Sequence, residues 1–298
     1  MKFNNQKFED AVRESLAASD LEFTEKNLEF ITGIHIAVEQ KLVTIDTETG
    51  WGKAANTYSV PWQGTSSAYN MTRVNLFLTW DMTKDGDLAL FPHIKALHAY
   101  DSASTPLEER QIQLHLFPNL KELYLYEVKA DNWAHLGNMT SLNMLYLFNC
   151  DGDGNEILMY ISTSHLDHIS MQHMGISDLS FIDWTRWQDV DLSHNEISDI
   201  TPMENSDIYY LNLSWNKISD IKSLESSCNY YLNLRHNQIE NINPLINRER
   251  EKKDMLRRLL LNYNPIPREQ LAKAAQLRLV LNDFTDTYRN VRSDFTYG

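Results

Sequence analysis

In the second half of the chain, apolar and polar residues alternate in a pattern whose first three copies begin 21 residues apart. Each copy has two apolar residues flanking one variable residue, an asparagine three positions later, and an isoleucine two positions after the asparagine. The short alternating run predicts a strand with one buried face, and the asparagine marks a turn. The copies run over 190–197, 211–218, 232–239 and 259–266.

Looser copies of the same frame precede these four. In three of them Met174, Cys150 or Val128 stands where the later copies have asparagine, so we expect side-chain packing to replace the hydrogen bonds of the amide there. Ile31, Ile34 and Ile36 begin the series. Taken one copy at a time from the C-terminal side, the apolar positions of the other looser copies are Leu166, Ile169, Met171, Ile176, Leu179 and Ile182; Leu142, Leu145 and Leu147; Leu120, Leu123 and Leu125; Ile94, Leu97 and Ala99; and Leu76 and Leu78.

One coil of this kind cannot bury its own apolar face, so successive coils must stack into a solenoid. The buried asparagine amide is expected to bond backbone groups of neighbouring coils, which would otherwise lack partners away from water. The pattern therefore predicts an α/β solenoid with a curved parallel sheet on its concave face.

Two segments carry a family resemblance. Residues 198–203 (Ser-Asp-Ile-Thr-Pro-Met) and 240–245 (Glu-Asn-Ile-Asn-Pro-Leu) resemble the return limb of bacterial internalin-type leucine-rich repeats. The stretches 8–16 and 23–32 are similar to the helical N-cap and first coil of such proteins, and the resemblance is tight from 166 to 266. It implies a leucine-rich-repeat solenoid with a recognition role and no shared catalytic residues.

Both ends of a solenoid need cover, and the sequence offers a helix for each. Phe8, Val12 and Leu16 have helical spacing and predict a helix over 5–18; residues 268–280 predict another. We therefore divide the chain into a helical N-cap (1–30), repeats (31–266), and a C-terminal cap and tail (267–298).

Two segments interrupt the repeats. Residues 46–72 hold Trp51, Tyr58, Trp62 and Tyr69, and this aromatic density predicts a packed flap. The charged insertion at about 247–255 predicts an exposed helical turn, or alternatively a contact for an acidic group.

The residue between the two apolar positions of each strand, and the residue after them, face the concave side. In the N-terminal half these positions are rich in aromatic residues, and in the C-terminal half they are small and polar. Contiguous exposed aromatics favour a binding site, whereas cover by the 46–72 segment or a lateral loop would make them internal. The predicted partner-binding residues are Phe77, Tyr100, Tyr124, Tyr126, Tyr146, Phe148, His173, Asp191, His194, Trp215, Arg235 and His236.

Composition and net charge limit the classes of partner that the chain is expected to bind. Hydrophobic residues make up 42% and charged residues 23% of the chain, as in ordinary globular domains, and the formal charge is −14. This charge argues against nucleic acid and anionic membranes and leaves room for a basic protein. Two cysteines are too few for a disulfide framework, and no signal-peptide or membrane-spanning run is seen. We expect a cytoplasmic protein, with export by another route left open.

Sequence motifs for catalysis were sought as well. His173, His194 and His236 with Asp191 could share a metal ion, but Trp215 interrupts their spacing, so a pH-dependent contact is the better reading. Residues 151–156 begin like a calcium loop but depart from it at the sixth and twelfth positions, which favours a plain turn. No phosphate loop, dinucleotide fingerprint or nucleophile elbow is seen, so we expect no catalytic residues, metal or cofactor.

The sequence thus predicts a protein–protein interaction module, and in its sharper form an inhibitor or immunity protein of a basic toxin or enzyme. An exported effector or surface adhesin stays open as the alternative. An enzyme using 46–72 as a lid over His98 and Asp101 is the third reading. The oligomeric state is not predicted.

Overall fold

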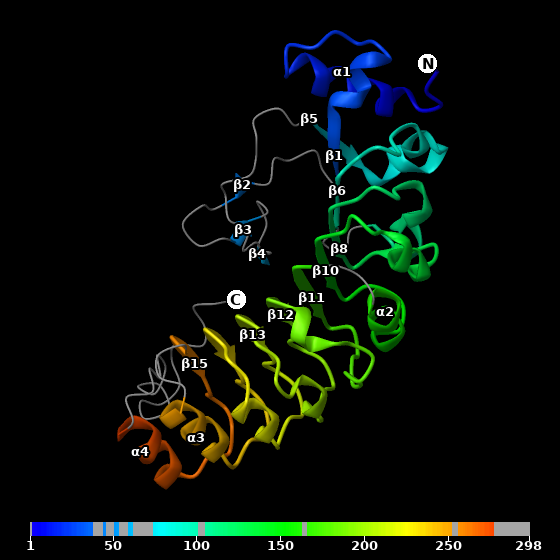
Figure 1. The fold of residues 1–298 in the computed structure, drawn as a ribbon. Helices are drawn as coiled ribbons and strands as arrows, with labels where there is room; N and C mark the ends of the chain where they lie inside the picture. The colour runs from blue at the N-terminus through cyan, green and yellow to red at the C-terminus, as the bar shows by residue number, and fades with distance from the viewer. Residues whose placement is uncertain are drawn as a thin grey trace.

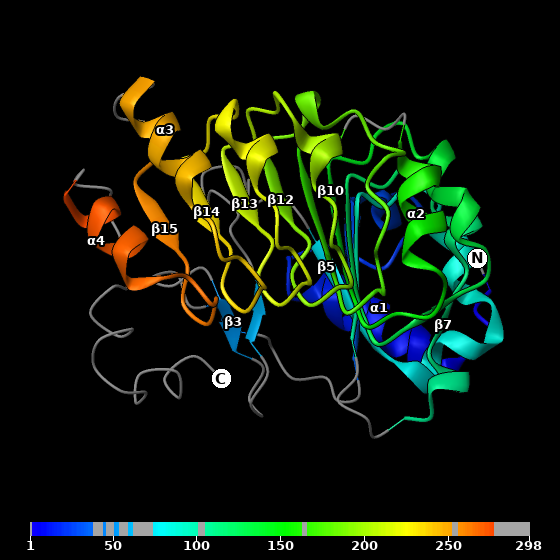
Figure 2. The same ribbon diagram turned by 90° about the horizontal axis from the view of Figure 1, so that it is seen from below.

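Ten parallel strands form one curved sheet in the computed structural model, which describes residues 2–37, 44–45, 51–53, 59–61, 74–100, 105–162, 166–251 and 256–276. Figures 1 and 2 show these strands side by side along the inside of an arc, with the connecting limbs outside. The strands are β1 (Ile31–Ala37), β5 (Val74–Thr79), β6 (Ala96–Tyr100), β8 (Glu122–Tyr126), β10 (Met144–Phe148), β11 (His168–Gln172), β12 (Asp189–Asp191), β13 (Tyr210–Asn212), β14 (Tyr231–Asn233) and β15 (Arg258–Leu260).

Helices lie on the connecting limbs. The α-helices are α1 (Gln6–Ala17), α2 (Gly154–Ile161), α3 (Asn243–Glu251) and α4 (Arg268–Gln276). Short 3-10 helices occupy most other limbs: η1 (Lys26–Phe30), η2 (Trp80–Asp85), η3 (Asp87–Leu90), η4 (Leu107–Glu109), η5 (Leu114–Leu116), η6 (Trp133–Asn138), η7 (Trp184–Arg186), η8 (Thr201–Met203) and η9 (Lys222–Glu225).

The order of the first strands differs from the sequence expectation. The residues of β1 were expected to begin the series, yet β1 lies between β5 and β6, and β5 is the edge strand. His35 on β1 is therefore in register with Phe77 on one side and His98 on the other. The connection from Ala37 to Val74 is longer than a 21-residue coil, so it can return the chain to either side of β1.

The apolar frame positions form a continuous core. In the second regular copy Leu211, Leu213 and Ile218 are 0% exposed, and the equivalent residues of the neighbouring coils are buried as well. Each coil thus buries its apolar residues against the coils before and after it, as the stacking argument requires. The ten-stranded parallel sheet and this shared core confirm the leucine-rich-repeat solenoid.

The asparagines bond backbone groups of the preceding coil, as predicted. Asn216 Oδ1 accepts from the Ile197 N–H at 3.0 Å, and its Nδ2 donates to Leu192 O at 2.9 Å and Leu213 O at 3.1 Å. Asn195, Asn237 and Asn264 repeat the arrangement.

Cys150 occupies the same slot in an earlier coil and does more than pack there. Its thiol lies 3.3 Å from Leu125 O in the preceding strand, so it partly replaces an asparagine Nδ2. A thiol is a weak donor and offers no amide oxygen, which leaves this coil with fewer cross-coil bonds than those carrying asparagine.

Helices occur in both predicted end segments: α1 lies within 5–18, and α4 begins at Arg268, while 277–280 lie outside the described residues. Helix α1 buries Phe8, Val12 and Leu16 and packs against β5, the edge strand of the sheet. The backbone N–H groups of Asn4 and Asn5 donate to the buried Asp87 carboxylate, which ties the start of the chain to η3. Helix α4 contacts α3 at the other end.

Helix α3 corrects one expectation. The charged stretch was expected to form an exposed helical turn; it is helical as far as Glu251, but Arg248 is only 4% exposed. Its guanidinium donates to the Asn229 Oδ1 at 2.9 Å inside the solenoid. The long aliphatic stem and planar head of arginine can be buried when backbone and amide oxygens satisfy the donors.

Within 46–72 the structure describes only two short strands, β3 (Trp51–Lys53) and β4 (Ser59–Pro61), and these form a sheet with β2 (Thr44–Ile45), which lies just before the segment. This small sheet is antiparallel, and Figure 1 draws it on the open side of the arc. Tyr58, Trp62 and Tyr69, and with them the predicted flap, lie outside the described residues. In the described part of the chain, no helix is both long and apolar enough to cross a membrane.

Residues 151–153 form a bend after β10, and residues 154–156 are already the first turn of α2, so the expected turn is present but shorter than predicted. Asp153 caps α2 by accepting from the N–H groups of Asn155 and Glu156, and Asp151 accepts from Ala130 and Trp133. Asp153 is therefore engaged in capping its own helix, and Asp151 in bonds to the preceding coil.

Candidate partner-binding surface

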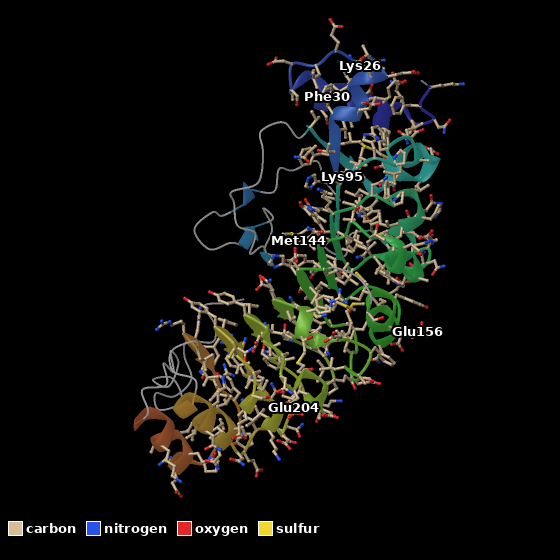
Figure 3. The ribbon with its side chains drawn as sticks, in the orientation of Figure 1. Lys26, Phe30, Lys95, Met144, Glu156 and Glu204 are labelled. Atoms are coloured by element: carbon tan, nitrogen blue, oxygen red, sulfur yellow. The ribbon has the colours of Figure 1, made fainter. Side chains whose placement is uncertain are left out.

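The N-terminal half of the concave face carries a column of five aromatic rings, which we call the strand column: Phe77, His35, His98, Tyr124 and Tyr146. Neighbouring centroids lie 4.9, 4.7, 4.3 and 4.3 Å apart in that order. The parallel register brings them into contact, because equivalent residues of adjacent strands stand side by side. The outer pairs of the column are stacked, whereas His98 meets His35 edge-on and is tilted against Tyr124. Figure 3 shows the inner side of the sheet near Met144, and Glu156 on the outer limb.

Burial reduces the apolar surface that these residues can offer to a partner. Tyr124 is only 6% exposed, and Phe77 and Tyr146 are half-buried, so the rings cover much of one another's surface. His35 was missed from the sequence because β1 was expected at the end of the sheet. The apolar surface that a partner can reach is therefore smaller than fully exposed aromatic side chains at these positions would offer.

A second pair of rings stands two residues further along the strands. Tyr126 and Phe148 stack with centroids 4.4 Å apart and planes 4° apart, and Tyr100 is the register neighbour of Tyr126. All three side chains are half-buried. They continue the aromatic face toward the ends of the strands.

The most continuous feature lies where the strands turn. His173, His194, Trp215, His236 and Tyr263, which we call the turn column, stack ring on ring with centroid distances of 4.4, 5.2, 3.7 and 4.0 Å. Phe148 adjoins His173 at 4.9 Å and links this column to the previous pair. Trp215 and Tyr263 remain 49% and 41% exposed. The turn column thus presents large rings to solvent.

Backbone conformation holds the turn column in place. Each of its residues has a positive φ between 54° and 60°, the left-handed region that side-chain-bearing residues rarely adopt. In this conformation the His194 and Trp215 N–H groups donate to carbonyls of the next coil at 3.0 and 2.9 Å. The cost of about 1–2 kcal/mol per residue is offset by these bonds and by ring stacking.

Polar concave residues in the C-terminal half are fixed by one another. The Asp191 carboxylate accepts from the Ser193 N–H and hydroxyl at 2.9 and 2.6 Å and from Asn212 Nδ2 at 2.9 Å. Burial raises the pKa of Asp191, and these hydrogen bonds oppose the rise. Arg235 bonds the Asn233 Oδ1 through its Nε at 3.3 Å. This part of the surface is rigid and polar.

Two of the histidines that were expected to titrate near neutrality, His173 and His194, have a pKa below the usual value because of burial. Burial lowers the pKa of His35 and of His194 to about 4, and it holds the pKa of His98 well below its usual range. A stacked ring loses hydration that the imidazolium needs. The rings of His173 and His194 are 20° from parallel, so their in-plane nitrogen lone pairs do not converge on one ion between them.

The pKa of one histidine, His168, is shifted in the opposite direction. His168 Nδ1 lies 2.6 Å from Asp189 Oδ2 on the next strand, and this hydrogen bond raises the pKa of His168 above 6.5. A raised folded-state pKa gives stability that is fully present below pH 6.5 and is lost as the pH rises through the folded value.

We expect Asp189→Asn to lower Tm by about 1–2 °C at pH 5.5 and by less at pH 8.5, because the lost pair contributes roughly 1 kcal/mol only when His168 is charged. Thermal denaturation followed by circular dichroism at both pH values measures the difference. His168→Gln removes the titrating group and serves as the control, since the Asp189→Asn effect on that background should not vary with pH. An equal loss at both pH values would contradict the pairing.

No protein-family model matches the chain, and no curated protein matches it either. Among solved structures, the chain is similar to an internalin, InlF, of Listeria monocytogenes, with 18% identity, a TM-score of 0.47, and coverage of 92% of this chain and 87% of that one. It is also similar to the internalin InlC2 of the same organism, with 21% identity, a TM-score of 0.42, and coverage of 60% and 75%. A leucine-rich-repeat protein of Leptospira interrogans shows 17% identity, a TM-score of 0.39, and coverage of 68% and 62%. The solved structures it resembles are thus internalins and other leucine-rich-repeat proteins, and its own sheet and asparagine bonds make this chain a leucine-rich-repeat solenoid.

Proposed function

We propose that the chain is a non-enzymatic interaction module that binds a protein through its concave face. The observation that carries the proposal is the turn column, in which Trp215 and Tyr263 stay largely exposed although their rings are locked by stacking. Exposed aromatic clusters favour protein contacts, and rings that are already ordered lose little entropy when a partner binds.

The net charge of −14 supports a basic partner, because opposite charge accelerates encounter. We extend the proposal to an inhibitor or immunity protein that masks a basic enzyme or toxin. The strand column and the Tyr126–Phe148 pair would extend the same contact toward the N-terminal half.

The test compares two pairs of exposed, stacked rings. A partner is first cross-linked to the full chain in native lysate and identified, and its affinity is then measured by calorimetry with purified proteins. The Trp215→Ala/Tyr263→Ala variant should bind about 100-fold more weakly, since two central aromatic contacts contribute about 2–4 kcal/mol together. Raising the ionic strength should slow association with a basic partner.

Tyr209 and Tyr230 supply a matched control. They are 50% and 40% exposed and stack at 4.7 Å, but they precede β13 and β14, at the opposite end of these strands from the turn column. Tyr209→Ala/Tyr230→Ala should change the affinity about twofold or less. If that variant loses binding while Trp215→Ala/Tyr263→Ala keeps it, the concave site is wrong.

A further inference from the structure

His115, Asp131 and His135 come together on the return limbs that follow β6 and β8. One ligand atom from each lies within 4.8 Å of the other two. His115 Nδ1 is 2.5 Å from Asp131 Oδ2, and the two imidazole rings are 5.8 Å apart. Two imidazoles and a carboxylate thus meet at a place remote from the turn column in sequence.

Backbone structure fixes this meeting point independently of the three side chains. β7 (Gln111–Ile112) and β9 (Lys129–Ala130) pair in parallel and lock the two limbs in register. The Asp131 N–H donates to Ile112 O at 2.9 Å, and Asp131 Oδ1 accepts from the Leu114 N–H at 2.8 Å. The carboxylate is therefore oriented with its second oxygen toward His115.

Buried neighbours anchor the two histidines. Leu114, beside His115, is 0% exposed, and Leu136, beside His135, is also 0% exposed, so both imidazoles project from limbs held in the core. The helix η6 that carries His135 is capped by Asn132, whose side chain accepts from the Ala134 N–H at 2.9 Å. The histidines can adjust their side chains, but the backbone beneath them is held in place.

We propose that these three residues form a site for a borderline divalent transition-metal ion of the Zn²⁺ class. Two imidazole nitrogens and one carboxylate oxygen match the ligands that zinc prefers, whereas Mg²⁺ and Ca²⁺ are bound mainly by oxygens. Bond lengths of about 2.0–2.1 Å in a tetrahedron place ligand atoms about 3.3 Å apart. The His115–Asp131 contact would open by less than about 1 Å, which an exposed imidazole permits.

Three protein ligands leave one tetrahedral position for water or for a group of another molecule. The ion would also join two successive coils, because His115 lies before β8 and the other two ligands lie after it. A metal that binds only the folded chain raises its thermal stability. The site does not depend on the proposed partner-binding function.

The test uses the full chain after chelator treatment and dialysis, titrated with ZnCl₂ by calorimetry near pH 7.5. We expect one Zn²⁺ bound per chain, a rise in Tm of about 5 °C at a hundredfold excess over Kd, and no comparable response to MgCl₂. His115→Gln and Asp131→Asn should each weaken binding at least tenfold, and Asp131→Asn keeps an oxygen for the Leu114 N–H.

His173→Gln is the matched control, since it removes one of the stacked pair formed with His194 and should leave zinc affinity unchanged. Circular dichroism of each variant checks that it is folded. Zinc binding that survives both His115→Gln and Asp131→Asn would overturn the site, as would a folded wild-type chain that binds no zinc below the millimolar range.

Discussion

Replacing Asn216 with alanine is expected to lower the free energy of unfolding by about 3–5 kcal/mol. The amide satisfies the Ile197 N–H and the carbonyls of Leu192 and Leu213, and Asn216 is only 8% exposed. Each buried backbone group left without a partner costs about 1–3 kcal/mol, and relaxation of the coil recovers part of the sum. Urea denaturation followed by circular dichroism, with the slope checked for a change in the unfolding mode, measures the loss.

Asn247→Ala is the control for this experiment. The Asn247 side chain is exposed on α3 and donates to the Glu225 carboxylate at 3.1 Å. Its replacement should alter stability by about 0.5 kcal/mol or less, since alanine also suits a helix. Equal losses in the two variants would mean that the asparagine slots do not hold the coils together.

Gly154→Ala is expected to destabilise the chain by about 2–3 kcal/mol, although alanine normally stabilises a helix over glycine by about 1 kcal/mol. A Cβ at position 154 would lie 2.4 Å from Met174 O and 2.7 Å from the Ile176 Cγ1. The first of these is a backbone atom of the next coil, so α2 or that coil must shift. Thermal and urea denaturation of the variant measure the effect.

Comparison with Gly175→Ala separates the steric clash from the backbone strain as causes of lost stability. Nothing lies within 4 Å of a Cβ there, but Gly175 has φ of +68°, so only left-handed strain of about 1–2 kcal/mol applies. The loss at Gly154 should exceed the loss at Gly175. A Gly154→Ala variant as stable as the wild type would show that α2 and the following coil do not approach this closely.

The sequence predicted the coils well because the same apolar positions recur in each of them and the period alone identifies the turn. From Leu166 to Ile266 the strands, the buried apolar positions of the repeat and the asparagine bonds were predicted on this basis, whereas the burial of Arg248 was not. The position of β1 could not be predicted, because the long Ala37–Val74 connection carries no repeat to fix its direction. His35 was missed for that reason.

The sequence predicted which residues lie on the candidate surface, but it did not predict how far their side chains are buried or how they stack. Alternation places Tyr124 on the concave side and the repeat places Trp215 at the end of its strand, yet neither shows that one ring is 6% exposed and the other 49%. Stacking depends on rotamers and on left-handed turns, which leave no mark in a hydrophobic pattern. His115, Asp131 and His135 were missed because their spacing of 16 and 4 residues matches no metal motif, and only the β7–β9 pairing brings them together.

The position of β1 makes the two ends of the solenoid mechanically unequal. Among the described strands, β15 pairs only with β14. A force applied from the C-terminal side therefore breaks the hydrogen bonds between one pair of strands at a time. A force on the N-terminus reaches β1 once α1 has come away, and β1 is bonded to both β5 and β6. Extraction from that end must break two ladders together and would leave β5 cut off from the rest of the sheet. A threading protease or translocase should therefore meet its greatest resistance when it pulls from the N-terminus.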